Sequence, residues 1–144
     1  MQVETESAHK KQIEDTINRW YFLLEHSRQE LHAGRWQEAV VSYHAAYSEA
    51  ELLVFISDCK NCAVKNYLRT LVEYSYALCK IDKAEQLSDL IAHACYTLNT
   101  CLTEALTLKL LQPLRGMRSS SDDERDLWMN QLFAEEAVHR KQVH

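Results

Sequence analysis

The pair Cys59-Lys-Asn-Cys62 is the first feature of this chain whose residue types and spacing suggest chemistry. Two thiolates at this spacing supply half of a zinc site, and the remaining ligands would come from His93, Cys95 or Cys101. The same pair can act as a redox dithiol when a preceding strand and a helix N-terminus lower the pKa of one thiol. No strand is predicted before Cys59. We therefore expect two reduced thiols at a junction between helices, with a metal site and a redox dithiol as alternatives.

Glutamate and histidine also occur at the Glu-x-x-His spacing, at Glu6 to His9 and at Glu136 to His139. Helical di-iron proteins use this spacing because residues three positions apart share a helix face. Both pairs lie near the chain ends among polar neighbours, whereas a di-iron site needs carboxylates inside a core. Glu73 comes close to an apolar stripe and is expected on a solvent face. We expect no catalytic residue, no resident metal and no cofactor, and hence no enzyme.

Two glycines and one proline in 144 residues limit the folds that remain. Sheet folds need a turn signal every 8 to 12 residues or so, and the chain cannot supply them. Phosphate-binding loops need clustered glycines, whereas Gly34 and Gly116 are far apart. The composition therefore predicts an all-α domain and excludes the enzyme classes that bind phosphate through glycine-rich loops.

The elements that must position these residues follow from a helical period of apolar side chains. Apolar residues recur every three or four positions along most of the chain, which is typical of amphipathic helices. We predict one domain over residues 1–144 with about six antiparallel helices. The expected units are a hairpin over 6–57, a hairpin over 63–98, and two C-terminal helices over 100–112 and 121–142.

Short signals place the expected ends of these helices. Gly34 is expected to form the first hairpin turn. Asp82 and Ser121 each stand three residues before a glutamate, which is the form of a capping box. Thr100 is expected to cap the fifth helix, and Pro113 to end it, because a proline disfavours the helical conformation of the residue before it.

The segment from Gly34 to Ala46 resembles the turn and second helix of a tetratricopeptide repeat. Trp36, Ala39 and Tyr43 stand where that family places its packing residues, and Ala84 takes the place of Ala39 in the second hairpin. The resemblance implies a right-handed array of helical hairpins with a capping helix at its C-terminus. The interval between the hairpins exceeds the family period of about 34 residues, so we expect an inserted turn near 58–62. The alternative is a six-helix domain without repeats.

The resemblance also implies a function, because repeats of this family bind a peptide or helix in a groove. This would make the chain a non-enzymatic protein interaction module, an adaptor or chaperone. A protein centred on the Cys59 and Cys62 pair is the alternative. The last helix has a broad apolar face that would cap the array or join a second copy as a homodimer, formed by Trp128, Met129, Leu132 and Phe133. The expected groove residues are Tyr21, Leu24, Arg28 and His32 from the first hairpin, and Asn66, Arg69, Glu73 and Tyr76 from the second.

Charge and the chain ends indicate where the protein acts. The formal net charge is −5, and no basic stripe stands out. Nucleic acid is therefore not an expected partner, because phosphate neutralisation supplies most of the affinity for it. The N-terminal residues are acidic and no long apolar run follows them, so we expect neither an export signal nor a membrane partner. The odd number of cysteines, five, also favours reduced thiols. The expected location is the cytoplasm.

Overall fold

The protein is a bundle of six α-helices. The computed structural model describes the backbone of residues 2–143 and the side chains of residues 5–137. Over these residues the chain forms six α-helices and a short 3-10 helix, with no strand, so the predicted all-α class and the number of helices are confirmed. The helices are α1 (Gln2–His32), α2 (Trp36–Ile56), α3 (Lys60–Lys80), α4 (Leu87–Asn99), α5 (Glu104–Ser119) and α6 (Asp122–Val143), and the 3-10 helix η1 (Ala84–Gln86) precedes α4.

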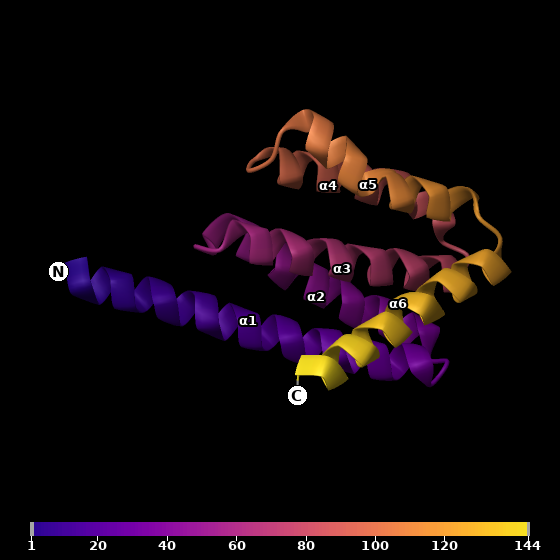
Figure 1. Cartoon of the computed structure of the whole chain (residues 1–144), viewed down its shortest axis with the longest axis horizontal. Coiled ribbons are helices and arrows are strands. Elements are labelled where there is room, and N and C mark those ends of the chain that lie inside the picture. The colour runs from indigo at the N-terminus through magenta and orange to yellow at the C-terminus, as the bar shows by residue number, and fades with distance from the viewer. Residues whose placement is uncertain (1, 144) are drawn as a thin grey trace.

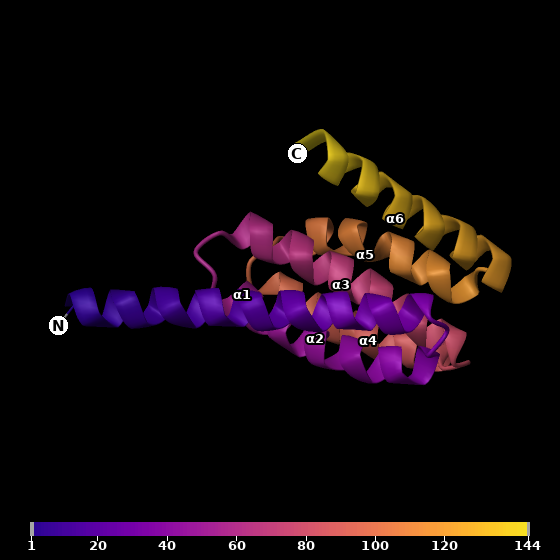
Figure 2. The ribbon, with the colours of Figure 1, turned by 90° about the horizontal axis from the view of Figure 1, so that it is seen from below.

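The helices are arranged as antiparallel neighbours with one exception. The helices α1, α2 and α3 follow one another side by side, and the α4–α5 pair stacks beyond α3 (Figure 1). The exception is α6, which leaves the end of α5 and runs diagonally across α3 towards α1. Figure 2 shows that α6 lies on the outer side of α3 and α5 and is inclined to them, with its C-terminal end farthest from the bundle. The C-terminal helix therefore faces α1 and α3.

Gly34 forms the turn of the first hairpin, as predicted. Its φ is +77°, in the left-handed region that favours glycine. The amide of Arg35 donates to the carbonyl oxygen of Glu30 at 2.9 Å, and the amide of Gly34 donates to that of Leu31 at 3.1 Å. This hydrogen-bond pattern is a Schellman motif, which satisfies carbonyl groups at the end of α1.

Asp82 has the corresponding place at the end of α3, and its predicted capping box does not form. Its φ is +59°, and the amide of Lys83 donates to the carbonyl oxygen of Leu78 at 2.8 Å. The side chain of Asp82 caps no helix, because η1 begins without a side-chain cap. Asp82 is therefore the left-handed residue that follows α3 in a second Schellman motif, and not an N-cap. Aspartate tolerates the left-handed region better than most residues do.

Both predicted ends of the fifth helix are wrong. The helix begins after Thr103, whose hydroxyl accepts from the amide of Leu106 at 3.2 Å, so Thr100 is not the cap. It then continues through Pro113 to Ser119 instead of ending at 112. The side chains on its inner face are at most 2% exposed, and they belong to Leu111, Leu114 and Met117. Pro113 lies on the exposed face, so burial on one side stabilises the helix despite the hydrogen bond lost on the other.

Buried residues of all six described helices form one hydrophobic core, and most of them lie on α2 and α3. Ala39, Ala46 and Ala50 on α2 are fully buried, and small residues at this spacing let neighbouring helices approach closely. Tyr43 and Tyr67 fill the space beside them and are also fully buried. The buried residues of α2 recur every three or four positions, as expected for the packing face of an amphipathic helix.

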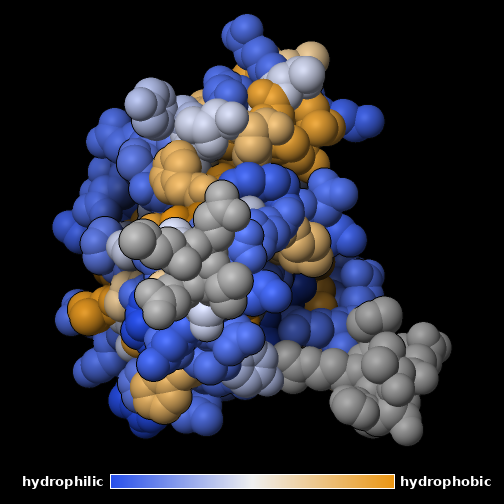
Figure 3. All heavy atoms as spheres, turned by 90° about the vertical axis from the view of Figure 1, so that its left-hand side faces the viewer, coloured by the Kyte–Doolittle hydropathy of each residue, from blue (hydrophilic) through white to orange (hydrophobic). Residues whose placement is uncertain are grey.

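The surface is mostly polar. Figure 3 views the end of the molecule from which α1 projects, and its hydrophobic residues gather towards the α4–α5 pair. Exposed apolar side chains on α5 include Leu106 and Leu108, each 41% exposed. None of the described helices is both long and apolar enough to cross a membrane.

Candidate functional site

A buried ion pair between α1 and α3 is the strongest polar feature of the structure. Arg28 on α1 donates to both carboxylate oxygens of Glu73 on α3, with Nε to Oε1 at 2.9 Å and Nη2 to Oε2 at 2.8 Å. The hydroxyl of Tyr43 donates to the same carboxylate at 2.8 Å. Glu73 is 0% exposed, so its predicted place on a solvent face is wrong. It is buried where α3 packs against α2 and α6, with Arg28 of α1 and Tyr43 of α2 on its carboxylate.

Phe133 and Glu136 of α6 also contact this ion pair, together with Arg69 of α3. Arg69 on α3 donates to Glu73 at 2.7 Å, and its Nη2 lies 2.8 Å from Glu136 on α6. The same Glu136 carboxylate also accepts from Arg28 at 3.2 Å. The ring of Phe133 receives both guanidinium groups, whose carbons lie 5.7 and 5.3 Å from its centroid. We call Arg28, Arg69, Glu73, Phe133 and Glu136 the arginine cluster.

The acids of this cluster change the titration of the groups around them. Burial alone would lower the pKa of Arg28, but the hydrogen bonds and charges of Glu73, together with Glu136 and Glu25, raise that pKa above its ordinary value. Burial and the Glu73 charge raise the pKa of Tyr43 as well. In this arrangement Arg28 and Tyr43 both donate hydrogen bonds to the buried carboxylate of Glu73.

A second contact holds the other end of α6. The ammonium group of Lys80 lies 2.6 Å from Oδ1 of Asp126, and the hydroxyl of Tyr76 donates to the same oxygen at 2.5 Å. The Lys80 ammonium also lies 5.3 Å from the centroids of the Trp36 and Tyr76 rings. Both ends of the α6 contact thus use a carboxylate of α6 and a cation of α3 beside an aromatic ring.

The α6 residues that make these contacts lie on one face of the helix. Asp126, Met129, Phe133 and Glu136 follow one another at intervals of three, four and three, so they form a single stripe. Met129 is 1% exposed, and no other described apolar side chain of α6 is buried to this degree. The helix is consequently held by carboxylates near the two ends of this stripe and by the buried Met129 between them.

The structure brings together five of the eight predicted groove residues. Tyr21 is 51% exposed and Leu24 lies in the core, while Asn66 is half-buried on α3 and its backbone oxygen accepts from Thr70. His32 packs edge-on against Phe133, with ring centroids 4.9 Å apart. The five residues that lie together beneath α6 are Arg28, His32, Arg69, Glu73 and Tyr76.

The predicted oligomer face packs on the chain's own core. Met129 is buried, and Trp128, Leu132 and Phe133 are half-buried against the core cluster. Leu127, beside them in the sequence, is 62% exposed and lies outside this contact. In this arrangement the apolar face of α6 covers α1 and α3 of the same chain.

Three residues that hold α6 were not predicted. Glu136 is found in the arginine cluster and not in a metal site, and the His139 side chain of its Glu-x-x-His pair lies outside the described residues. Asp126 and Lys80 were assigned no role. The stripe from Asp126 to Glu136 would have indicated the two acids, because they flank an apolar centre on one face of α6, whereas nothing in that stripe points to Lys80.

Acid is expected to weaken the Asp126 contact. The hydrogen bonds from Lys80 and Tyr76 hold the pKa of Asp126 below its ordinary value of 3.8. A carboxylate with a lowered pKa in the folded state contributes stability above the pH at which the unfolded side chain titrates, and loses it as the pH falls through the folded pKa. The Asp126→Asn variant should therefore be less stable than the parent chain above about pH 5, with a difference that shrinks on acidification. Urea unfolding of both proteins from pH 7 to pH 3 measures this; a difference independent of pH would contradict it.

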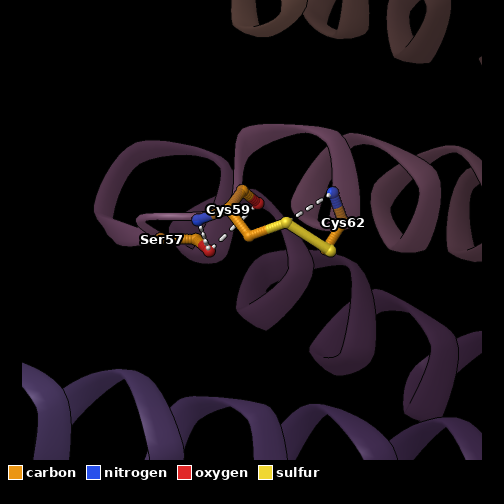
Figure 4. Close-up of a disulfide and its surroundings, with 3 residues drawn as sticks. All are labelled: Ser57, Cys59 and Cys62. Atoms are coloured by element: carbon orange, nitrogen blue, oxygen red, sulfur yellow. Dashed lines mark hydrogen bonds between the residues drawn. A yellow bond between two sulfur atoms is a disulfide. The ribbon is translucent and has the colours of Figure 1, made fainter.

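The structure joins Cys59 and Cys62 by a disulfide at the start of α3 (Figure 4). This corrects the expectation of two free thiols, and the reason is that one helical turn brings the two side chains onto one face. Cys59 is the N-cap residue, and its sulfur accepts from the amide of Cys62 at 3.4 Å. Ser57 holds the preceding turn, since the amide of Cys59 donates to its hydroxyl at 3.2 Å. Among the described residues no group of three or more histidines, cysteines or acids is placed to hold a metal ion.

The disulfide predicts a thiol count. Cys79, Cys95 and Cys101 are free, so protein purified without reductant and then denatured should show three reactive thiols, and five after reduction. In the folded protein Cys79 should react last, because it is buried and burial raises the pKa of its thiol. A Cys59→Ser, Cys62→Ser double variant should show three thiols under both conditions. Five thiols in the unreduced parent would show that the pair is not bonded in solution.

Comparison of the chain with protein-family models, curated proteins and solved structures finds no match in any of the three.

Proposed function

We propose that this chain is a non-enzymatic protein interaction module, of the adaptor or chaperone kind, that binds an amphipathic helix on the surface formed by α1 and α3. One observation carries the proposal: α6 of the same chain lies on that surface with Asp126, Phe133 and Glu136 against its cations. An amphipathic helix laid in a groove is a common mode of peptide recognition. The surface that α6 covers is therefore suited to a partner helix of similar pattern.

The contacts of α6 define the chemistry of that partner. It would carry an acid for Lys80, an apolar residue in the place of Met129, an aromatic ring for the two arginines and a second acid ten positions after the first. Arg69 is the key residue for selectivity, since planar guanidinium groups bind carboxylates and stack on rings at once. Helices without the aromatic residue or the second acid should bind weakly.

The proposal is tested with a labelled peptide of residues 121–137 and the full chain. A Met129→Ala, Phe133→Ala double variant should bind the peptide at least tenfold more tightly than the parent, because the parent's own α6 competes at an effective concentration in the millimolar range. Adding Arg69→Glu to this variant should weaken binding by roughly tenfold or more.

Lys65→Glu is the matched control, because Lys65 is exposed on the same helix and the reversal changes the charge equally. Circular dichroism would establish that each variant is folded. Equal peptide binding by the Arg69→Glu and Lys65→Glu variants would contradict the proposal, as would the absence of binding by the loosened chain.

The disulfide favours a second candidate, a thiol-dependent function centred on Cys59 and Cys62. Both sulfurs are used in the bond, so the pair can ligate a metal only after reduction. The proposed location is the cytoplasm, in keeping with three free cysteines. Disulfides there are usually transient and redox-active, so thiol exchange with a reduced dithiol protein would test this candidate.

A further inference from the structure

A pocket of about 620 Å³ opens between α2, α3 and α4 and shares no lining residue with the surface under α6. Its volume lies within the range typical of small-molecule sites. Four rings and two carboxylates give the pocket its chemistry. They belong to His44, Tyr47, Glu51, Tyr74, Asp89 and His93.

The rings form a continuous aromatic lining. The Tyr47 ring lies 5.8 Å from that of Tyr74 and 6.1 Å from that of His93, measured between centroids, and His44 lies 5.9 Å from Tyr74. Both tyrosines are buried to at least nine-tenths and form the base, whereas both histidines are exposed at the rim. The Nδ1 atom of His44 and the hydroxyl of Tyr74 are joined by a hydrogen bond of 3.1 Å, which fixes one side.

The pocket carries negative charge without a fixed cation. No lysine or arginine lines it. The carboxylate of Glu51 lies 2.6 Å from Nε2 of His93, and among the described side chains Asp89 makes neither a hydrogen bond nor an ion pair. Burial raises the pKa of Tyr47 most, followed by the neighbouring hydroxyl of Tyr67 and then by the charge of Glu51. The pocket therefore combines an aromatic base with two carboxylates and no lysine or arginine.

We propose that this pocket binds a small organic cation of the alkylammonium class. Aromatic faces attract a cation through the ring quadrupole, and cages of aromatic residues are a known means of holding quaternary ammonium groups. The carboxylates of Glu51 and Asp89 add Coulomb attraction, which a partly enclosed site screens less than bulk water does. A neutral molecule of the same shape gains neither contribution.

Choline and its neutral carbon analogue 3,3-dimethylbutan-1-ol are the matched probes, titrated into the full chain by NMR. Choline should give saturable shifts at residues of the pocket, and the neutral analogue should bind at least about fivefold more weakly. A peptide carrying trimethyl-lysine distinguishes a free amine from a methylated protein as the natural source, according to which probe binds more tightly. Equal binding of choline and the neutral analogue, or no saturation by choline, would overturn the proposal.

Variants test which residues are responsible. Glu51→Gln removes one charge while keeping the side-chain shape, and should weaken choline binding by about tenfold. The control Glu38→Gln makes the same change at an exposed position of α2 and should leave binding unchanged. Tyr74→Leu should weaken binding about threefold to tenfold, whereas Tyr74→Phe keeps the ring and should retain it. Identical losses in the Glu51→Gln and Glu38→Gln chains would overturn the assignment, with melting temperatures showing that both are folded.

Discussion

Replacing Glu73 by alanine is expected to lower the free energy of unfolding by about 3–5 kcal/mol, because it leaves a buried charge without its partner. The carboxylate is fully buried and accepts from Arg28, Arg69 and Tyr43. Without this carboxylate, the Arg28 guanidinium keeps its contacts with Glu25 and Glu136 and loses both hydrogen bonds to Glu73. Urea unfolding followed by circular dichroism measures the loss.

Glu136→Ala is the matched control for this prediction. It removes a carboxylate from the same cluster, but the Glu136 side chain is 28% exposed. Water can replace part of what is lost there, so the cost should be below about 1 kcal/mol. Equal costs for the two variants would show that burial of Glu73 does not decide the energetics of the cluster.

Replacing Leu114 by alanine is expected to destabilise the protein by about 2–4 kcal/mol, through lost burial and the cavity that remains. Leu114 is 1% exposed and follows Pro113 directly. The prediction therefore tests whether α5 packs on the core beyond the proline, since a side chain in contact with water would tolerate the change. Thermal unfolding with a two-state fit provides the measurement.

Leu108→Ala makes the same change earlier in α5, at a side chain that is 41% exposed. Much of its apolar surface is already in contact with water, so its loss should cost less than about 1 kcal/mol. If Leu114→Ala cost no more than Leu108→Ala, the packing of the second half of α5 would be wrong.

The local part of the fold could be predicted from single residues and short patterns. Gly34 marks a turn because its left-handed conformation is strained for residues with a Cβ atom. Ser121 was correctly placed before the last helix, and its hydroxyl accepts from the amide of Glu124 at 3.2 Å. Apolar periodicity located the helices because it reflects the faces that they bury.

Local signals failed where distant residues decide the outcome. Pro113 ends a helix in isolation, but the burial of Leu114 and Met117 favours its continuation. Asp82 stands before a glutamate and reads as an N-cap, yet the end of α3 requires it in a left-handed turn. At Pro113 tertiary packing outweighs a local preference, whereas at Asp82 one local signal, the end of α3, outweighs another.

The candidate surface could be predicted only in part. The resemblance to a helical repeat directed attention to Arg28 and Arg69, which do lie together. It gave no reason to pair them with Glu136, which is 108 residues from Arg28 in the sequence. Pairing over such a separation depends on where α6 turns back across the bundle, and a single sequence carries no direct signal of that.

The residues of the arginine cluster are synthesised at different times. The N-terminal helices leave the ribosome first, and α6 leaves last. Once α3 has emerged, Arg28 and Arg69 share the buried carboxylate of Glu73, Glu25 lies beside Arg28 alone, and a carboxylate that contacts both arginines from above arrives only with Glu136. For the several seconds that translation of the remaining residues takes, at roughly 5–20 residues per second, the nascent chain presents a cationic surface. Under the proposed function, an acidic partner helix would meet the least competition from α6 during this interval.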